Sequence, residues 1–325
     1  MKALVYTAPH VFEFRDAVDP VTGDGDVLIK VDSVGICGSD MHAFLGHDGR
    51  RPAPLILGHE VAGITADGRR VTVNPLVSCG ACRFCLSGRD NLCMERQIIS
   101  MPPREGGFAE KLVMPEQNLI SVPDHVPLNK AALAEPLACG WHAVRLGRHR
   151  LHDDPEKVRV LVIGGGAIGV GAAFCAKAQG LNDITLVEPN PLRSQYLNEK
   201  TGLNVLHPDE VAGRTDFDLV IDGVGYEATR ALTSAVACPG GVILHIGLGS
   251  ATGGIDARRL TLQEITFIGT YTYTVEDFRE TAAALFDGRL GELDWIEERP
   301  LAEGQQAFLD IRAGQAVTPK IILKP

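Results

Sequence analysis

The sequence predicts an α/β protein in which an irregular, β-rich N-terminal part precedes a doubly wound parallel sheet. Short β-branched runs at 27–31 and 71–73, separated by Gly, Pro and Asp clusters, indicate a mostly antiparallel β region from residue 1 to about residue 140. From Val158 onward, continuous apolar runs alternate with helical patterns, which is typical of parallel strands with both faces covered. The 325 residues exceed one ordinary compact domain.

Each predicted element depends on its local pattern. Residues 128–148 are rich in Ala and Leu and indicate helix, and the amphipathic segment VEDFRETAAALFDG at 275–288 indicates another. The run VRVLVI at 158–163 indicates a strand buried on both faces. Further strands are predicted at 183–187, 218–222, 241–246, 266–269 and 320–323. The last of these could rejoin the N-terminal part.

Composition and charge exclude several classes of protein. Hydrophobic residues make up 45% and charged residues 22% of the chain, which is a globular balance. The formal charge of −10 argues against a nucleic-acid partner, whose binding depends on basic side chains. No stretch approaches the ~20 apolar residues of a membrane helix, and the N-terminal apolar run is too short for a signal-peptide core. We therefore expect a cytoplasmic protein without a membrane partner, in which clustered cysteines favour metal over disulfides.

Four of the eight cysteines form a compact motif. Cys79, Cys82, Cys85 and Cys93 have the spacing C-x2-C-x2-C-x7-C. The short gaps let successive thiolates converge on one tetrahedral ion, and the longer gap forms a lobe that closes the fourth position. Because all four ligands come from the chain, the expected ion is structural. Zinc is the predicted ion, and an iron–sulfur cluster is the alternative, since tetrahedral thiolate sites suit both.

A glycine-rich turn follows the strand at 158–163. Gly164, Gly166 and Gly169 satisfy the pattern G-x-G-x-x-G and open an Ala-rich helix. In this context the first Gly permits the tight turn, the second lets the backbone approach a pyrophosphate, and the third allows close helix–strand packing. The helix N-terminal amides, those of Ala167 and Ile168 included, then receive the phosphates. The pattern predicts a dinucleotide-binding Rossmann domain.

An acidic residue strengthens this prediction. Glu188 ends the second predicted strand, 19 residues after Gly169, where an acid should bind the hydroxyls of the adenosine ribose. A carboxylate at that point repels a 2′-phosphate, so NAD is favoured over NADP. Arg193 is a candidate to lie over the adenine, with a simple surface ion pair to Glu188 as the alternative.

Potential ligands for a second metal lie in the first region. A catalytic zinc needs three protein ligands of mixed type and one open position, and Cys37 and His59 could supply two of them. Their neighbours suit that role, because Asp40 is a carboxylate able to orient an imidazole, and Ser39 and Glu60 adjoin the two ligands.

Glu135, in the sequence AEPL, is an acid in an otherwise apolar segment. Its alternative interpretation is a helix N-terminal carboxylate before a proline in the first turn.

Together these motifs resemble the zinc-containing medium-chain dehydrogenase/reductase superfamily along essentially the whole chain, closest to the sorbitol, galactitol-phosphate and threonine dehydrogenase branch. The matching segments are GICGSDMH at 35–42, GHEVAG at 58–63, the cysteine motif, GGFAE at 106–110, AEPLACGWHA at 134–143 and GGGAIG at 164–169. The resemblance implies a GroES-like catalytic zinc-binding domain at 1–143, an NAD-binding Rossmann domain at 144–275, and a C-terminal segment at 276–325 that returns to the catalytic domain.

The resemblance also implies how the site would work. Cys37 and His59 would bind a catalytic zinc, with Glu60 or Glu135 as the third ligand. Ser39 would accept the hydroxyl proton of the substrate and pass it toward solvent through the cofactor ribose and His42. Two zinc ions per chain, NAD, a small-molecule alcohol substrate and a homodimer or homotetramer are therefore expected.

The predicted function is the zinc-dependent oxidation of a secondary alcohol, a polyol or sugar-derived alcohol, to a ketone with hydride transfer to NAD. Two positions depart from the polyol branch, because Ala43 replaces a common Tyr and Thr272 a common substrate-binding Arg. A threonine-type amino-alcohol dehydrogenase is the first alternative. A non-catalytic zinc-binding interaction protein is the second, and the presence of Cys37, His59 and Ser39 argues against it.

Overall fold

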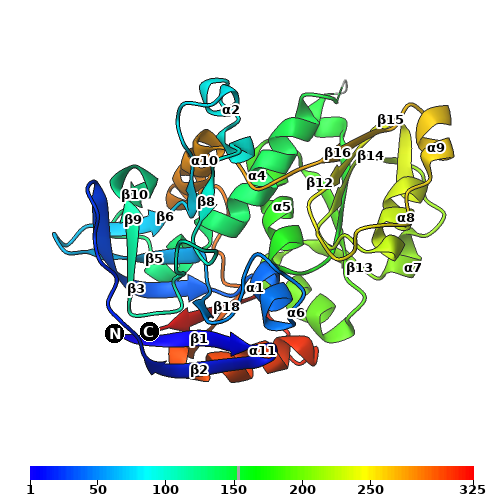
Figure 1. The fold of residues 1–325 in the computed structure, drawn as a ribbon. Coiled ribbons are helices and arrows are strands. Elements are labelled where there is room, and N and C mark those ends of the chain that lie inside the picture. Colours follow the sequence, from blue (N-terminus) through cyan, green and yellow to red (C-terminus); the bar gives the residue numbers. More distant parts are fainter. Residues whose placement is uncertain (152–153) are drawn as a thin grey trace.

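The computed structural model describes residues 1–151 and 154–325. Figure 1 shows a β-rich body, which contains both chain termini, beside a second body built on one parallel sheet. Helix α4 (Ala134–Arg148) runs between the two bodies and contacts strands of both.

The β-rich body contains two principal sheets. The larger sheet has the strand order β10 (Leu119–Ser121), β6 (Arg70–Val73), β5 (Glu60–Thr65), β3 (Asp26–Gly35), β18 (Lys320–Lys324) and β17 (Ile296–Pro300), with β9 (Lys111–Pro115) also paired to β3. The smaller sheet consists of β2 (Val11–Asp16), β1 (Lys2–Ala8) and β4 (Leu55–Ile56). Strand β18 pairs antiparallel with β3, so the end of the chain lies within the N-terminal sheet.

The second body confirms the predicted parallel sheet. Its six strands are parallel, in the order β13 (Asn204–Leu206), β12 (Asp183–Val187), β11 (Arg159–Ile163), β14 (Phe217–Asp222), β15 (Ala237–His245) and β16 (Thr266–Gly269). Strand β15 begins four residues before the predicted 241–246. The strand that leads into the glycine-rich turn, β11, is central, which is the doubly wound arrangement.

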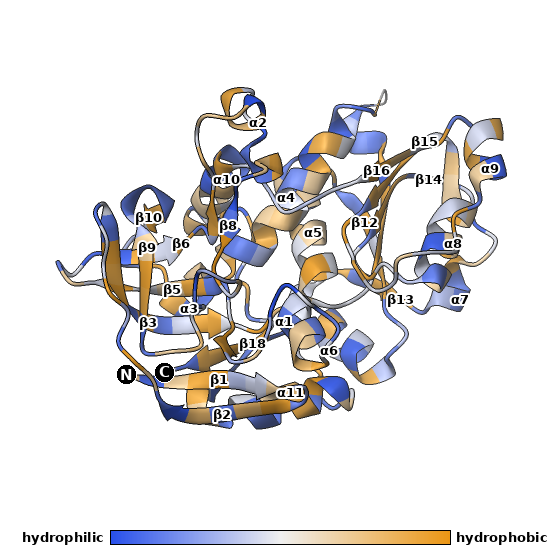
Figure 2. Ribbon diagram, viewed as in Figure 1, coloured by the Kyte–Doolittle hydropathy of each residue, from blue (hydrophilic) through white to orange (hydrophobic). Residues whose placement is uncertain are grey.

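Helices cover both faces of this sheet. Successive side chains of β11 point to opposite faces, so Val160 and Val162 join the core under α4 and α5 (Ala167–Ala178), whereas Leu161 and Ile163 join the core on the other side. The second face also carries α7 (Pro208–Val211), α8 (Glu227–Val236) and α9 (Ala257–Leu262). In Figure 2 the strands of the sheet are hydrophobic and several surrounding helices carry hydrophilic segments.

The Ala- and Leu-rich segment at 128–148 forms two helices, α3 (Leu128–Ala131) and α4. Pro136 stands in the first turn of α4, where the missing N–H has no intrahelical partner to lose, so the proline marks the start of the second helix. Helix α10 (Val275–Phe286) packs against α4, and α6 (Pro191–Thr201) follows β12. Helix α11 (Gly304–Arg312), against the smaller sheet, was not predicted. None of the helices in the described part of the chain is both long and apolar enough to cross a bilayer.

Candidate active site

A cleft of about 250 Å³ lies between the two bodies. The β-rich body contributes Cys37, Glu60 and Lys320 to its lining, and the glycine-rich turn contributes Gly166 and Ala167. The cleft therefore brings the predicted metal ligands and the predicted phosphate-binding turn, which are far apart in the sequence, to one place.

Three potential metal ligands converge at this cleft, two of them, Cys37 and Glu60, in its lining. One ligand atom each from Cys37, His59 and Glu60 lie within 4.8 Å of one another. Cys37 precedes α1 (Gly38–Phe44), and Gly35 on β3 stands opposite Glu60 on β5. A Cβ atom at Gly35 would lie 1.9 Å from Glu60 Oε2, so only glycine leaves room for this carboxylate. A thiolate, an imidazole and a carboxylate are a donor set suited to a zinc ion that keeps one open position.

The imidazole of His59 is oriented by its neighbours. Its Nδ1 atom lies 3.4 Å from Asp40 Oδ1 and 3.4 Å from Ser100 Oγ. Burial would raise the pKa of the Asp40 carboxyl, but the facing His59 and the N–H of Cys37, which donates to Asp40 Oδ2 at 3.0 Å, lower it. Asp40 thus lies where a carboxylate can fix the ring of a histidine ligand, as its position in the sequence predicts.

The two candidate acids have different partners. Glu60 accepts hydrogen bonds from Lys320 Nζ at 2.6 and 2.7 Å, whereas Glu135 Oε1 accepts one from the Tyr273 hydroxyl at 2.7 Å. Both acids are buried, and burial raises the pKa of Glu135. Within the described chain, the group of converging ligands includes Glu60 and not Glu135. Neither Lys320 nor Tyr273 was identified from the sequence.

Ser39 and His42 lie on α1, three residues apart and so on one side of the helix. A third residue beside them was not identified from the sequence. The buried guanidinium of Arg51 places Nη2 3.5 Å from Ser39 Oγ, and its Nε donates to Ser100 O at 3.1 Å. Arg51 also donates to Asp48 at 2.6 Å. The presence of this acid three residues earlier was the only feature of the local sequence that indicated a partner for the arginine. The cation therefore connects Ser39 with the segment that contacts His59.

The four-cysteine lobe has the geometry of a tetrahedral thiolate site. The sulfur of Cys85 lies 3.9 Å from that of Cys79 and 3.6 Å from that of Cys82. Metal–sulfur bonds of ~2.3 Å in tetrahedral geometry separate the sulfurs by about 3.8 Å. The sulfur of Cys93 joins the group, and all four lie within 4.8 Å of one another. Backbone N–H groups lower the pKa of Cys79, and they lower that of Cys82 to about 6, whereas burial and the neighbouring cysteines raise that of Cys85 to about 12.

The glycine-rich turn is shaped by close backbone packing. Gly164 has a φ of +104°, and a Cβ at Gly169 would lie 1.8 Å from the carbonyl oxygen of Gly164. Apart from Gly166 and its two chain neighbours, no atom of the described residues lies within 4 Å of the Cβ position of Gly166, which precedes α5 and lines the cleft. The N-terminus of α5, which begins with Ala167 and Ile168, is therefore open toward the cleft and able to receive an anion.

Glu188 and Arg193 lie at the edge of this turn. The carboxylate of Glu188 accepts hydrogen bonds from the N–H of Gly165 at 2.9 Å and from the N–H of Asn190 at 2.7 Å. Arg193 Nη1 lies 4.0 Å from Glu188 Oε2, but its shorter contact joins Nη2 to Ala316 O at 2.7 Å. Arg193 therefore connects the second body to the C-terminal part of the chain, a contact that its sequence position did not indicate.

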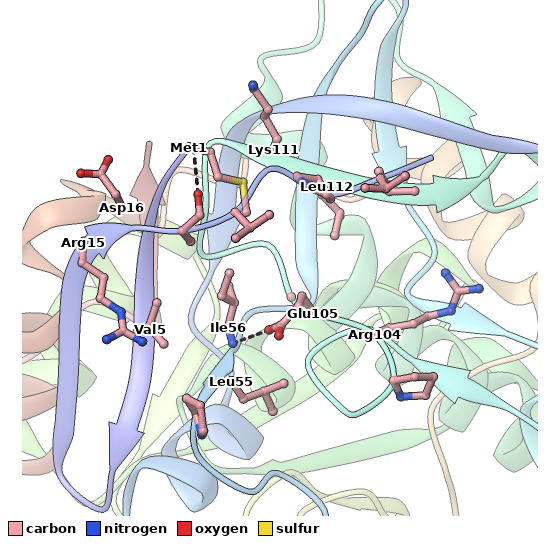
Figure 3. Close-up of a pocket in the computed structure, with 18 of the residues that line it drawn as sticks. Met1, Val5, Arg15, Asp16, Leu55, Ile56, Arg104, Glu105, Lys111 and Leu112 are labelled. Carbon is pink, nitrogen blue, oxygen red and sulfur yellow. Dashed lines mark hydrogen bonds between the residues drawn. The ribbon is translucent and has the colours of Figure 1, made fainter. Parts of the chain in front are cut away.

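A larger hollow, of about 880 Å³, lies elsewhere on the β-rich body. Figure 3 shows Arg15 and Arg104 on opposite sides of it and the N–H of Ile56 bonded to Glu105 between them. It shares no lining residue with the cleft and contains none of the predicted site residues. Size therefore does not identify the candidate active site, whereas the convergence of ligands and the glycine-rich turn does.

Comparison with known proteins agrees with this location. Residues 23–124 match the alcohol dehydrogenase GroES-like domain, and residues 167–287 match the zinc-binding dehydrogenase domain. The chain is 31% identical over 313 residues to L-galactonate-5-dehydrogenase of Escherichia coli. This alignment covers 89% of this chain and 88% of the relative. It is 29% identical over 281 residues to sorbitol dehydrogenase of Arabidopsis thaliana, covering 78% and 76% of the two chains.

Solved structures show the same fold. An Escherichia coli oxidoreductase of unknown specificity superposes with a TM-score of 0.90 at 26% identity, over 99% of this chain and 98% of that one. Acetophenone reductase from Geotrichum candidum, in complex with NAD, gives a TM-score of 0.89 at 25% identity, over 100% and 97% of the two chains.

Proposed function

Since this chain belongs to the zinc-binding alcohol dehydrogenase family and is an oxidoreductase, we propose that it oxidises a secondary alcohol of a polyol or sugar-derived substrate to a ketone, with hydride transfer to NAD. The observation that carries this proposal is the convergence of Cys37, His59 and Glu60 beside the cleft that the glycine-rich turn also lines. Relatives named for galactonate and sorbitol support the substrate class.

In this proposal Cys37, His59 and Glu60 hold the catalytic zinc, and the four cysteines of the lobe hold a second, structural zinc. The sulfur, nitrogen and oxygen donors of the first site and the four sulfurs of the second fit these two roles. When bound, the catalytic zinc supplies a Lewis acid that lowers the pKa of the substrate hydroxyl. Glu135 lies beside the three ligands and is proposed as a neighbour of the metal rather than a ligand to it.

The chain's own residues position the cofactor. The N–H groups at the start of α5, near Gly166 and Ala167, would receive the pyrophosphate, and Glu188 would accept hydrogen bonds from the adenosine ribose hydroxyls. Because Glu188 is buried and bonded to the turn itself, its charge lies where a 2′-phosphate would have to enter, which supports NAD over NADP. The nicotinamide supplies the hydride acceptor.

Ser39 is proposed to accept the substrate proton. Its Oγ atom lies on α1, directly after the ligand Cys37 and Gly38, and would pass the proton through the cofactor ribose to His42. The guanidinium of Arg51 beside Ser39 Oγ orients the hydroxyl and lets it bond the substrate oxygen in a defined direction. Orientation of the Ser39 hydroxyl by Arg51 would contribute to catalysis and would require no change at the metal site.

We propose the same division of the chain that the sequence predicts: a catalytic domain at 1–143, a cofactor domain at 144–275 and a returning segment at 276–325. Strand β16 is an edge strand of the cofactor sheet and offers unpaired backbone groups, so a homodimer or homotetramer would pair through it. A cytoplasmic location stays a prediction.

The test is NADH formation by purified protein on a panel of polyols, sugar acids and amino alcohols, with and without a zinc chelator. We expect chelator-sensitive activity on a secondary alcohol, two zinc ions per chain, and loss of one zinc together with activity in Cys37→Ser. The matched variant Cys85→Ser removes the other zinc. If protein that carries both zinc ions oxidised none of the alcohols, the result would contradict the proposal. Activity on amino alcohols alone would favour the threonine-type alternative.

A further inference from the structure

The Tyr273 side chain contacts the candidate active site from the cofactor sheet. It follows β16, is 1% exposed and packs against the ring of Phe278, with 5.5 Å between ring centroids. Its hydroxyl donates to Glu135 Oε1 at 2.7 Å. Among the described residues this is the only hydrogen bond to the Glu135 carboxylate, so the position of that acid depends on the tyrosine.

The loop that carries Tyr273 is attached to the four-cysteine lobe. Asn91 Nδ2 donates to the carbonyl oxygen of Tyr271 at 2.8 Å, and the N–H of Val275 donates to Asp90 Oδ2 at 2.9 Å. Both lobe residues belong to η1 (Asp90–Leu92), which directly precedes Cys93. The lobe therefore holds the loop on either side of Tyr273.

The helix that carries Glu135 is attached to α10, the helix that follows this loop. Asp277, in the first turn of α10, pairs with His142 Nδ1 at 2.7 Å and with Arg145 Nε at 2.5 Å, both on α4. Figure 1 shows α10 beside α4, and the two helices are in contact. Glu135 stands in the first turn of α4, so these contacts hold the helix that carries Glu135 against the helix that follows Tyr273.

Two buried acids lie near the candidate metal position, and one of them is among the converging ligands. Glu60 is held by Lys320 and lies among the converging ligands. Glu135 is close enough for the charges of His59 and Glu60 to act on it, but its oxygens lie outside that group. A carboxylate left free beside a divalent ion would take its open position, which an alcohol dehydrogenase must keep for substrate.

We propose that Tyr273 is a positioning residue that holds Glu135 beside the catalytic metal and so reserves the fourth coordination position for the substrate oxygen. The inference rests on the proposed function. Tyr273 acts through Glu135, and its own position depends on the four-cysteine lobe.

The test uses full-length enzyme with zinc in the four-cysteine site and cobalt in the catalytic site, because cobalt absorption reports coordination number independently of turnover. Tyr273→Phe keeps the ring and its packing and removes the hydroxyl. We expect weaker visible bands, as the coordination number rises, and a KM for the alcohol raised about tenfold with a smaller change in kcat. Tyr196→Phe, whose hydroxyl contacts Asp294 O at 3.4 Å, is the matched control and should match the wild type.

Two further variants separate the outcomes. In Glu135→Gln the amide still accepts from Tyr273, so the cobalt spectrum should equal that of the wild type; a changed spectrum would mean that Glu135 is already a ligand and would overturn the inference. In a protein that already carries Glu135→Ala, the added Tyr273→Phe should not change KM further. If Tyr273→Phe raised KM as much in that protein as in the wild type, the inference would also be overturned. Wild-type protein that binds no catalytic-site cobalt and oxidises no alcohol would instead refute the proposed function.

Discussion

The ammonium group of Lys320 lies 2.6 Å from Glu60 Oε1 and 2.7 Å from Glu60 Oε2, and both side chains are almost completely buried. The two residues are 260 positions apart in the sequence, on β18 and β5. Lys320 Nζ also donates to Ile36 O at 2.8 Å, next to the candidate ligand Cys37. The returning C-terminal strand therefore supplies the cation that accompanies a buried acid in the candidate metal site.

Replacement of this cation should be costly. In Lys320→Met protein without metal in the catalytic site, the Glu60 carboxylate keeps its burial and loses its cation partner, so the free energy of unfolding should fall by about 3–5 kcal/mol, measured by urea denaturation. Lys324→Met is the matched control on the same strand, because Lys324 and Asp32 are each about one third exposed and such pairs contribute ~0–1 kcal/mol. Equal losses in the two variants would contradict a special role for the Lys320–Glu60 pair.

Removal of the proposed proton acceptor should affect turnover rather than metal content. We expect Ser39→Ala to lower kcat about 10²–10⁴-fold, the usual range for loss of a positioned acid–base group, with two zinc ions still bound. Ser121→Ala, at an exposed position on β10, should leave kcat unchanged. If Ser39→Ala retained wild-type kcat at saturating alcohol, the hydroxyl would not be on the proton path.

Cofactor preference should depend on the charge of Glu188. In Glu188→Ser the repulsion of a 2′-phosphate is removed, so the ratio of kcat/KM with NAD to that with NADP should fall about 10–100-fold. The same change removes the acceptor of the Gly165 N–H, so kcat/KM with NAD should also decrease. Glu276→Ser, which removes a carboxylate that is 70% exposed and does not line the hollow beside Glu188, serves as control. An unchanged ratio would place the ribose elsewhere.

Acid stability should depend on Asp277. Burial would raise the pKa of this carboxyl, but hydrogen bonds from His142, Arg145 and Thr274 hold it well below its usual range. The unfolded chain takes up this proton near pH 4 while the folded protein stays ionised, so the stabilisation is complete above about pH 4 and is lost as the pH falls further, toward the folded-state pKa.

In Asp277→Asn the decline in the free energy of unfolding between pH 4 and lower pH should therefore be shallower than in the wild type, in urea titrations at each pH. At neutral pH the variant should be less stable, because His142 and Arg145 lose a charged partner. Asp209→Asn is the control, since the side chain of Asp209 is 91% exposed. If the free energy of unfolding fell equally with decreasing pH in Asp277→Asn and in the wild type, Asp277 would not be responsible for the loss of stability at acid pH.

The features that could be predicted from the sequence share one property, which is that their parts lie close together along the chain. Cys79 and Cys93 are the ends of a segment that forms its own lobe, and Gly164 and Gly169 stand within one strand–turn–helix unit. For such motifs the backbone itself fixes the distances. The family resemblance extended this reasoning to Cys37 and His59, whose convergence the structure shows.

The choice between the two acids was left open by the sequence and depends on tertiary contacts. Glu60 lies among the converging ligands beside Lys320, whereas Glu135 is drawn to Tyr273, 138 residues away. Arg51, which contacts Ser39, was missed for the same reason. Nothing near Glu60 or Glu135 in the sequence indicates its partner.

By itself, therefore, the sequence determined the fold class, the four-cysteine group and the glycine-rich turn, because local spacing and strand periodicity carry that information. It indicated Cys37 and His59 through the family resemblance. Only the tertiary structure decided which acid faces the ligands and which groups hold it in place. The physical reason is burial: a charged side chain removed from water must have a partner, and in this protein those partners arrive on strands and loops from distant parts of the chain.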